Sequence, residues 1–289
     1  MLVKLIRKKS IFLALVALIV FTLVASTGNP RYLQSQDRQP MKNCWIAGSA
    51  VKPEHLVGFC TNLTKLNISS LTANLNLSAK ERFLAAIQSK LPIVPPAGNY
   101  EYILLRAYGA AFINPNPEIK LPPKIVFADD KEVKAFQATL TMGKVNNTND
   151  CYLQKAAANA FNRAKAQVAI ALKSGYGASD CTRDFATNLR FWRKYAHNKT
   201  LEKIKEGKET KILGIVAPPG ASQHLWGLAI DLQVTNAKQK QALYQNGWFQ
   251  TVEDDIPHWT YLGELLDKLA ELGLQNKVVR GASYWVTPL

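Results

Sequence analysis

The 289-residue sequence lacks several patterns that define common protein classes. It has no internal repeat, no low-complexity tract and no fingerprint of a nucleic-acid-binding motif, and its basic residues are scattered. The net charge of +15, from 36 basic and 21 acidic residues, favours an anionic partner such as nucleic acid, a lipid surface or an acidic cell-wall polymer. Because no motif for nucleic acid accompanies the charge, we predict no nucleic-acid partner, and a solvated basic surface is the simpler interpretation.

The sequence also lacks a hydrophobic run of the usual membrane-spanning length. The uncharged run from Ile11 to Ala25 falls short of the ~20 residues of a full span, and it follows four basic residues. Residues 1–26 therefore predict either a cleaved signal peptide or a retained N-terminal membrane anchor. Both alternatives predict an exported protein, in the periplasm or cell envelope. The polar residues 27–43 predict a linker.

Cysteines are few, and none has the close Cys-x-x-Cys spacing of a structural zinc site. The four that occur are Cys44, Cys60, Cys151 and Cys181, an even number that suits disulfides in an exported chain. Four cysteines allow three pairings. We predict Cys44–Cys60 and Cys151–Cys181, because these pairings close the shortest loops.

Helix and strand signals are mixed along the rest of the chain and predict an α+β fold. A capping box at Ser78-Ala79-Lys80-Glu81 predicts a helix start, Lys124–Phe127 predicts a short strand, and Asn149-Asp150 predicts the opening of another helix. Residues 44–148 are expected to form a mainly helical accessory region. Residues 149–289 are expected to hold a small antiparallel sheet flanked by helices. Strands are predicted at 168–172, 227–234 and 258–262, and helices at 185–195, 237–245 and 264–272.

Two short stretches near the C-terminus offer metal ligands. The first is Ser222-Gln223-His224-Leu225-Trp226-Gly227-Leu228-Ala229-Ile230-Asp231, and the second is Asp255-Ile256-Pro257-His258-Trp259. Together they supply two imidazoles and a carboxylate, which is the ligand inventory of a catalytic zinc site with one position open for water. A lone histidine is more often a core or surface residue. Two histidines beside a carboxylate in such stretches favour a metal site instead.

The spacing Ser-x-His-x-x-Gly-x-Ala-x-Asp, followed later by His-Trp, resembles the VanY-type D-alanyl-D-alanine carboxypeptidases and dipeptidases. These are zinc peptidases of the bacterial cell wall, and the resemblance covers roughly residues 151–263. It implies that His224, Asp231 and His258 bind one Zn²⁺ per chain and that Ser222 donates to the substrate. The implied substrate is peptidoglycan or its stem peptides.

Two positions depart from this family's pattern. Asp255 stands where the family has a glutamate as general base, and aspartate is one methylene shorter. Glu253 and Asp254 are nearby alternatives, and the three residues are also compatible with a solvated acidic turn. Gly177 stands where the family's Ser-Gly-Tyr-Arg turn has an arginine that helps to hold the substrate carboxylate. Candidate replacements for this cation are Arg183, Arg190, Arg193 and Arg280.

We therefore predict a zinc metallopeptidase in which water activated by the metal attacks the peptide carbonyl. Asp255 is the predicted general base and then the general acid. D-alanyl-D-alanine carboxypeptidase activity is the default that the resemblance implies. The loss of the family arginine leaves a peptidoglycan endopeptidase open, because that reaction needs no clamp on a terminal carboxylate. Both departures leave open a zinc-containing cell-wall binding module without catalysis.

Overall fold

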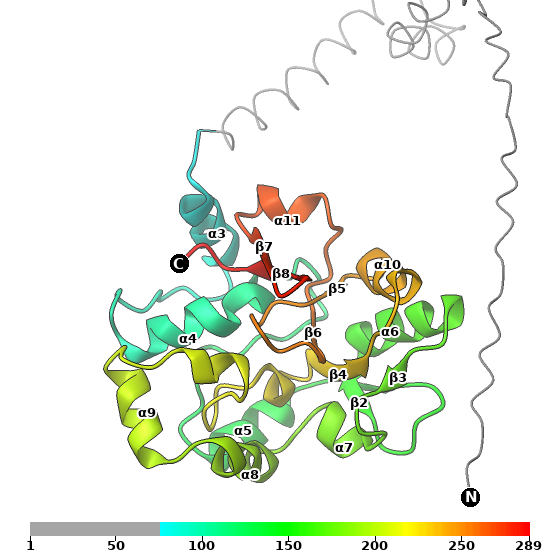
Figure 1. Ribbon diagram of the computed structural model, residues 1–289, viewed down its shortest axis with the longest axis horizontal. Coiled ribbons are helices and arrows are strands. Elements are labelled where there is room, and N and C mark those ends of the chain that lie inside the picture. Colours follow the sequence, from blue (N-terminus) through cyan, green and yellow to red (C-terminus); the bar gives the residue numbers. More distant parts are fainter. Residues whose placement is uncertain (1–75) are drawn as a thin grey trace, which may run out of the picture. The chain divides into compact units, whose positions relative to one another are not determined.

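The computed structural model describes residues 76–289 (Figure 1). The predicted signal peptide or anchor, the linker and the Cys44–Cys60 pair lie outside these residues. Among the helices of the described part, none is long and apolar enough to cross a membrane.

The described chain alternates short helices with short strands. The N-terminal helices are α3 (Ala79–Ile87), α4 (Tyr100–Tyr108), the 3-10 helix η1 (Gly109–Ile113) and α5 (Asp130–Gln137). The middle segment contains β1 (Met142–Lys144), β2 (Tyr152–Gln154), α6 (Lys155–Gln167), β3 (Ala171–Leu172), α7 (Gly177–Asp180), α8 (Phe185–Tyr195) and α9 (Asn198–Lys205). The C-terminal segment contains η2 (Lys211–Gly214), η3 (Gln223–Trp226), β4 (Ala229–Gln233), α10 (Ala237–Gln245), β5 (Trp248–Phe249), β6 (His258–Tyr261), α11 (Lys268–Glu271), β7 (Gln275–Val279) and β8 (Ala282–Val286).

The central sheet is antiparallel and has the order β3-β4-β6-β5. Strands β4 and β6 are its inner pair, and Figure 1 shows them near the centre of the folded part that residues 76–289 form. Their register sets Asp231 directly opposite His258 and Ile230 opposite Trp259. Cross-strand partners point to the same face of a sheet, so this register brings two distant sequence positions together. The predicted α+β fold with a small antiparallel sheet is confirmed.

One hydrophobic core joins the N-terminal helices to the sheet. Trp226, Trp248 and Trp259 are all fully buried, which agrees with a packing role for these tryptophans. Phe112 meets Trp226 edge-on, with ring centroids 5.6 Å apart. The Asn114 side-chain amide donates to the carbonyl of Tyr261 in β6. Helices α3 and α4 therefore pack on the same core as the sheet that carries the predicted metal ligands.

Two local predictions were wrong. Lys124–Phe127 forms bends rather than a strand, although Ile125 and Phe127 are buried. The preceding prolines lack backbone N–H donors, and the Phe127 N–H bonds to the Gly220 carbonyl instead of to a strand ladder. The helix expected at 149–150 begins only at Lys155, because residues 152–154 pair with β1 as strand β2.

The C-terminal hairpin of β7 and β8 was not predicted from the sequence. Its two-residue turn places Arg280 at φ 50° and Gly281 at φ 79°. Two consecutive positive φ angles are typical of the turn that matches the twist of a tight hairpin. The glycine at the second position was the local signal for it.

Candidate metal centre

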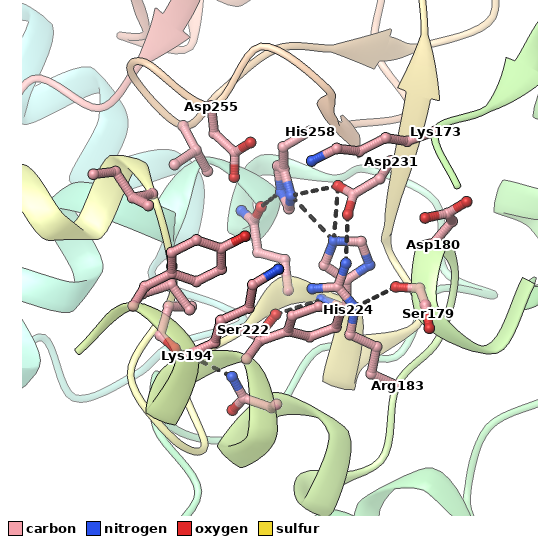
Figure 2. A pocket seen from close by; sticks show the side chains of 18 of the residues that line it. Lys173, Ser179, Asp180, Arg183, Lys194, Ser222, His224, Asp231, Asp255 and His258 are labelled. Atoms are coloured by element: carbon pink, nitrogen blue, oxygen red, sulfur yellow. Dashed lines mark hydrogen bonds and ion pairs between the residues drawn. The ribbon is translucent and has the colours of Figure 1, made fainter. Parts of the chain in front are cut away.

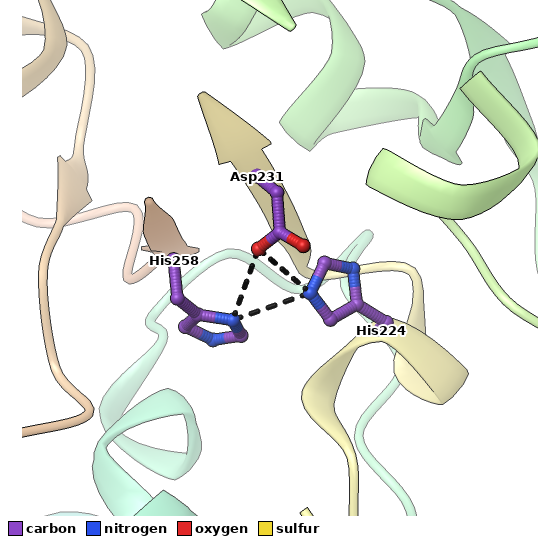
Figure 3. A group of neighbouring side chains, drawn as sticks. All are labelled: His224, Asp231 and His258. Atoms are coloured by element: carbon purple, nitrogen blue, oxygen red, sulfur yellow. Dashed lines mark hydrogen bonds and ion pairs between the residues drawn. The ribbon is translucent and has the colours of Figure 1, made fainter. Parts of the chain in front are cut away.

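Three side chains from two strands and one 3-10 helix converge at one point (Figure 3). His224 Nε2 lies 3.2 Å from His258 Nδ1 and 3.3 Å from Asp231 Oδ1. His258 Nδ1 lies 3.6 Å from the same carboxylate oxygen. All three residues are buried. The sequence stretches that offered metal ligands are therefore brought into a single cluster.

The spacing of these atoms fits a zinc ion. Two ligand atoms that are each about 2.0–2.1 Å from a tetrahedral zinc lie roughly 3.3 Å apart. The three observed separations of 3.2, 3.3 and 3.6 Å are close to that value. Two imidazole nitrogens and one carboxylate oxygen are also the donor types that zinc accepts. The residues present can hold the metal that the predicted resemblance implies.

A turn at Gly227 makes the approach of His224 to Asp231 possible. This glycine ends η3 in the left-handed conformation, with φ at 66°. A Cβ atom there would lie 3.2 Å from the backbone nitrogen of Gln154, so a larger residue would meet strand β2. The chain can therefore pass from the 3-10 helix directly into β4 with both ligands on one side.

Each imidazole is oriented by a hydrogen bond from its other nitrogen. His224 Nδ1 lies 2.8 Å from the carbonyl oxygen of Cys181, which can only accept, so this nitrogen carries the proton and Nε2 is free to bind metal. His258 Nε2 lies 2.8 Å from Oε1 of Gln223, which leaves Nδ1 free in the same way. These two acceptors, which lie on the far side of each imidazole from the cluster and are called outer partners below, thus select the tautomers that a metal requires.

Gln223 is itself fixed on three sides. Its Nε2 donates to the carbonyl oxygen of Tyr108 at 2.6 Å, so its Oε1 faces the histidine. That oxygen also accepts from the Thr260 hydroxyl at 2.8 Å. Sequence reasoning did not single out Gln223. Its position directly before His224, inside the stretch 222–231, was the available signal.

The protonation states also suit a metal. Burial lowers the pKa of His224 to about 4, so the imidazole is neutral at physiological pH. Burial alone would raise the pKa of Asp231, but the nearby His224, His258 and Arg183 side chains hold it well below its usual value. A neutral imidazole and an ionised carboxylate are the forms that coordinate metals.

The cluster lies at the wall of a cavity of about 510 Å³ (Figure 2). Ser222 also lines this cavity and is buried; its Oγ accepts from the His224 backbone N–H at 3.3 Å. In the described part of the chain its hydroxyl hydrogen has no acceptor. Large side chains stand exposed at the cavity edge: Tyr176 is 72% exposed and Ile215 57%. The cavity is roomy enough for a peptide segment.

Of the three acidic candidates, Asp255 alone lines this cavity. Burial raises its pKa to about 6, and Asp231 adds to this while His258 opposes it. Glu253 instead binds the Lys277 ammonium at 2.7 Å, and it lines a different cavity together with Asp254. The solvated-turn interpretation therefore suits Glu253 and Asp254, whereas Asp255 faces the metal ligands' side of the cavity (Figure 2).

The four arginine candidates have different surroundings. Arg183 lines the cavity but binds the metal-ligand candidate Asp231. Arg190 also lines it, whereas Arg193 and Arg280 do not. Lys194, four residues after Arg190 on α8, enters the same cavity (Figure 2). Sequence reasoning missed Lys194, although its i, i+4 spacing from Arg190 on an amphipathic helix was a readable signal.

Position 177 has no room for any side chain. A Cβ atom on Gly177 would lie 2.4 Å from the backbone nitrogen of Cys151 and 2.5 Å from Oδ1 of Asp150. The preceding turn is held by Asp180, whose carboxylate accepts from the Ser174 backbone N–H and hydroxyl at 2.7 and 2.8 Å. The turn is therefore present without its arginine, and a cation for a substrate must come from another element.

Cys151 and Cys181 form a disulfide, with their Cα atoms 5.4 Å apart. Both residues are fully buried. The bond joins the segment before β2 to the segment that follows α7, next to the carbonyl that orients His224. The disulfide therefore lies beside the ligand cluster.

Comparison of the sequence with curated proteins gives no match. A protein-family model matches one segment of the chain, and this segment contains the disulfide, the cavity-lining turn, helix α8 and all three candidate metal ligands. Residues 148–270 match the VanY family model, D-alanyl-D-alanine carboxypeptidase, and the resemblance predicted from the sequence is confirmed.

Proposed function

We propose that this chain is an exported zinc-dependent peptidase that hydrolyses peptidoglycan stem peptides, most simply by removing a terminal D-alanine. The family match supports a carboxypeptidase-type function at the family level. The observation that carries the proposal is the cluster of His224, Asp231 and His258, whose ligand atoms all lie within 4.8 Å of one another. Export is proposed from the pattern of residues 1–26 alone.

The zinc held by these three residues would supply Lewis-acid polarisation of the scissile carbonyl and would make water a stronger nucleophile near neutral pH. The carbonyl of Cys181 and the amide of Gln223 keep both imidazoles in the required tautomers. The surrounding burial keeps bulk water from competing for these hydrogen bonds.

Asp255 is the proposed general base. Its carboxylate lines the cavity beside His258, and its raised pKa, about 6, is close to the value that suits proton transfer at neutral pH. In the proposed reaction a carboxylate oxygen of Asp255 accepts the proton of the attacking water. The same oxygen then gives this proton to the leaving amine, so that one group serves both halves of the hydrolysis.

The cations of α8 are the proposed binding site for the substrate's terminal carboxylate. Arg190 and Lys194 line the cavity and form no ion pair within residues 76–289. Arg183 is engaged with Asp231, and Gly177 leaves no space for a side chain. The free hydroxyl hydrogen of Ser222 adds one donor near the ligands. Two cations one helical turn apart can bind a carboxylate that an arginine at position 177 would otherwise hold.

A digestion assay tests this proposal. Purified protein is incubated with defined muropeptides, with and without a zinc chelator, and the products are read by mass spectrometry. The expected result is loss of one terminal D-alanine that the chelator blocks and added Zn²⁺ restores. Cleavage of a cross-link instead would assign an endopeptidase. No product from a folded, zinc-loaded sample would reject the enzyme and favour a cell-wall binding module.

A further inference from the structure

The segment from Cys181 to Arg183 contacts two of the three ligand residues at once. The Cys181 carbonyl accepts from His224 Nδ1 at 2.8 Å. Two residues later, the Arg183 guanidinium binds Asp231 through Nη2 and Oδ2. We propose that residues 181–183, here named the positioning arm, set the metal affinity of the site, and that Arg183 restricts Asp231 to one ligating oxygen. This inference rests on the proposed metal site.

The two oxygens of Asp231 have different partners. Oδ1 faces both imidazoles, at 3.3 Å from His224 and 3.6 Å from His258. Oδ2 is bound by Arg183. The side chains of Asp231 and Arg183 are each only 12% exposed, so water competes little for this ion pair. Asp231 therefore presents Oδ1 to a metal, while Oδ2 is already occupied.

Arg183 is held in this position from three directions. Its Nε donates to the Ser179 carbonyl, and its guanidinium lies over the Phe191 ring of α8, 4.7 Å from the ring centroid. Its backbone N–H donates to the His224 carbonyl at 3.2 Å. A guanidinium fixed in this way can hold one carboxylate oxygen with little freedom to swing away.

The arm is in turn fastened to strand β2. Cys181 is bonded to Cys151, which directly precedes β2. The Thr182 hydroxyl donates to the Tyr152 carbonyl at 2.7 Å, and the Thr182 backbone N–H donates to the same oxygen at 3.2 Å. The disulfide and these two hydrogen bonds fix the carbonyl of Cys181 where it can orient His224.

Freeing Oδ2 would change how a metal is held. A carboxylate that loses its outer partner can turn and offer both oxygens, which raises the coordination number above the four that suits zinc. Outer-shell partners of this kind typically contribute about 10-fold to 100-fold in metal affinity. Arg183→Met removes the guanidinium and keeps much of the apolar stem against Phe191. Arg193→Met is the matched control, because Arg193 is exposed and does not line the cavity.

The test measures Zn²⁺ affinity by competition with a chromogenic chelator, and coordination by the visible spectrum of the Co²⁺-loaded protein. Four-coordinate Co²⁺ absorbs more strongly than five- or six-coordinate Co²⁺, because a tetrahedral site has no centre of inversion. Arg183→Met is expected to weaken Zn²⁺ binding about 10-fold to 100-fold and to reduce the Co²⁺ absorption, whereas Arg193→Met leaves both unchanged. Circular dichroism at the assay temperature checks that each variant is folded.

The double variant Cys151→Ala with Cys181→Ala tests the fastening separately. It is expected to weaken Zn²⁺ binding while the protein remains folded. If this double variant does not fold, the comparison of Arg183→Met with Arg193→Met still decides the proposal. Unchanged affinity and an unchanged Co²⁺ spectrum in Arg183→Met would overturn the positioning role. Failure of the wild-type protein to bind Zn²⁺ would overturn the metal site itself, and with it both the proposed function and this inference.

Discussion

Replacing the buried Gln223 by leucine should weaken both the fold and the metal site. This glutamine is 1% exposed and joins three groups: His258 Nε2, the Thr260 hydroxyl and the Tyr108 carbonyl. Leucine is similar in size but has no polar atom. The variant Gln223→Leu therefore removes the hydrogen bonds with little change in packing volume.

The size of the effect follows from the partners left behind. Thr260 keeps the Thr251 hydroxyl at 2.8 Å, and the Tyr108 carbonyl stands at the N-cap of η1, where it accepts the first bond of that helix. His258 Nε2 is therefore the group left unsatisfied. One unsatisfied buried group costs about 1–3 kcal/mol, so the free energy of unfolding should fall by about 1–3 kcal/mol. His258 also loses the acceptor that selects its tautomer, so Zn²⁺ affinity should fall about 10-fold to 100-fold.

The two effects are measured separately. Thermal and urea unfolding of the metal-free protein measure the stability, and chelator competition measures the Zn²⁺ affinity. The matched control is Gln233→Leu, because Gln233 is exposed at the end of β4 and, among residues 76–289, its amide donates only to the Lys173 carbonyl at 2.8 Å. The control should change the stability by less than about 0.5 kcal/mol. If Gln223→Leu matched this control in both measurements, the assignment of Gln223 as the outer partner of His258 would be wrong.

Three further variants test other parts of the site. Asp255→Asn should lower kcat by about 100-fold to 10,000-fold while Zn²⁺ affinity stays unchanged, and near-normal turnover would reject Asp255 as the base. Gly177→Ala should destabilise the protein more than Gly175→Ala, because a Cβ at 177 meets backbone 2.4 Å away, whereas a Cβ at 175 meets nothing within 4 Å and costs only the backbone strain of a φ of 76°; equal unfolding midpoints would contradict this. Replacing Arg190 and Lys194 by methionine should raise KM about 10-fold or more for peptides with a free terminal carboxylate and leave it unchanged for amidated peptides. Equal effects on both peptides would reject the carboxylate site.

The sequence alone predicted the three residues of the candidate metal cluster. His224 and Asp231 are seven residues apart in one stretch, and the strand predicted at 227–234 carries Asp231 in the structure. Donor chemistry restricts such a site to few residue types, and the resemblance to the VanY-type motif indicated which two histidines and which carboxylate would form it. The Cys151–Cys181 pair was also predicted, because it belongs to the set of pairings that closes the shortest loops.

Local patterns were less informative where tertiary contacts decide the backbone. The apolar run at Lys124–Phe127 has a strand-like composition, but its N–H at Phe127 bonds to Gly220, far along the chain. The paired strands β1 and β2 and the hairpin of β7 and β8 are short, and short strands depend on partners that no local window contains.

Only the tertiary structure decided which polar residues form hydrogen bonds or ion pairs with the three candidate ligands. The register of β4 against β6 set Asp231 opposite His258, and the packing of α4 brought the Tyr108 carbonyl to Gln223. Four arginines were equal candidates in the sequence, and the fold directed Arg183 to Asp231 and Arg190 to the cavity. The ligand types follow from chemistry that a sequence displays directly. Their outer partners follow from distances between elements far apart in the chain, which are fixed when the core packs.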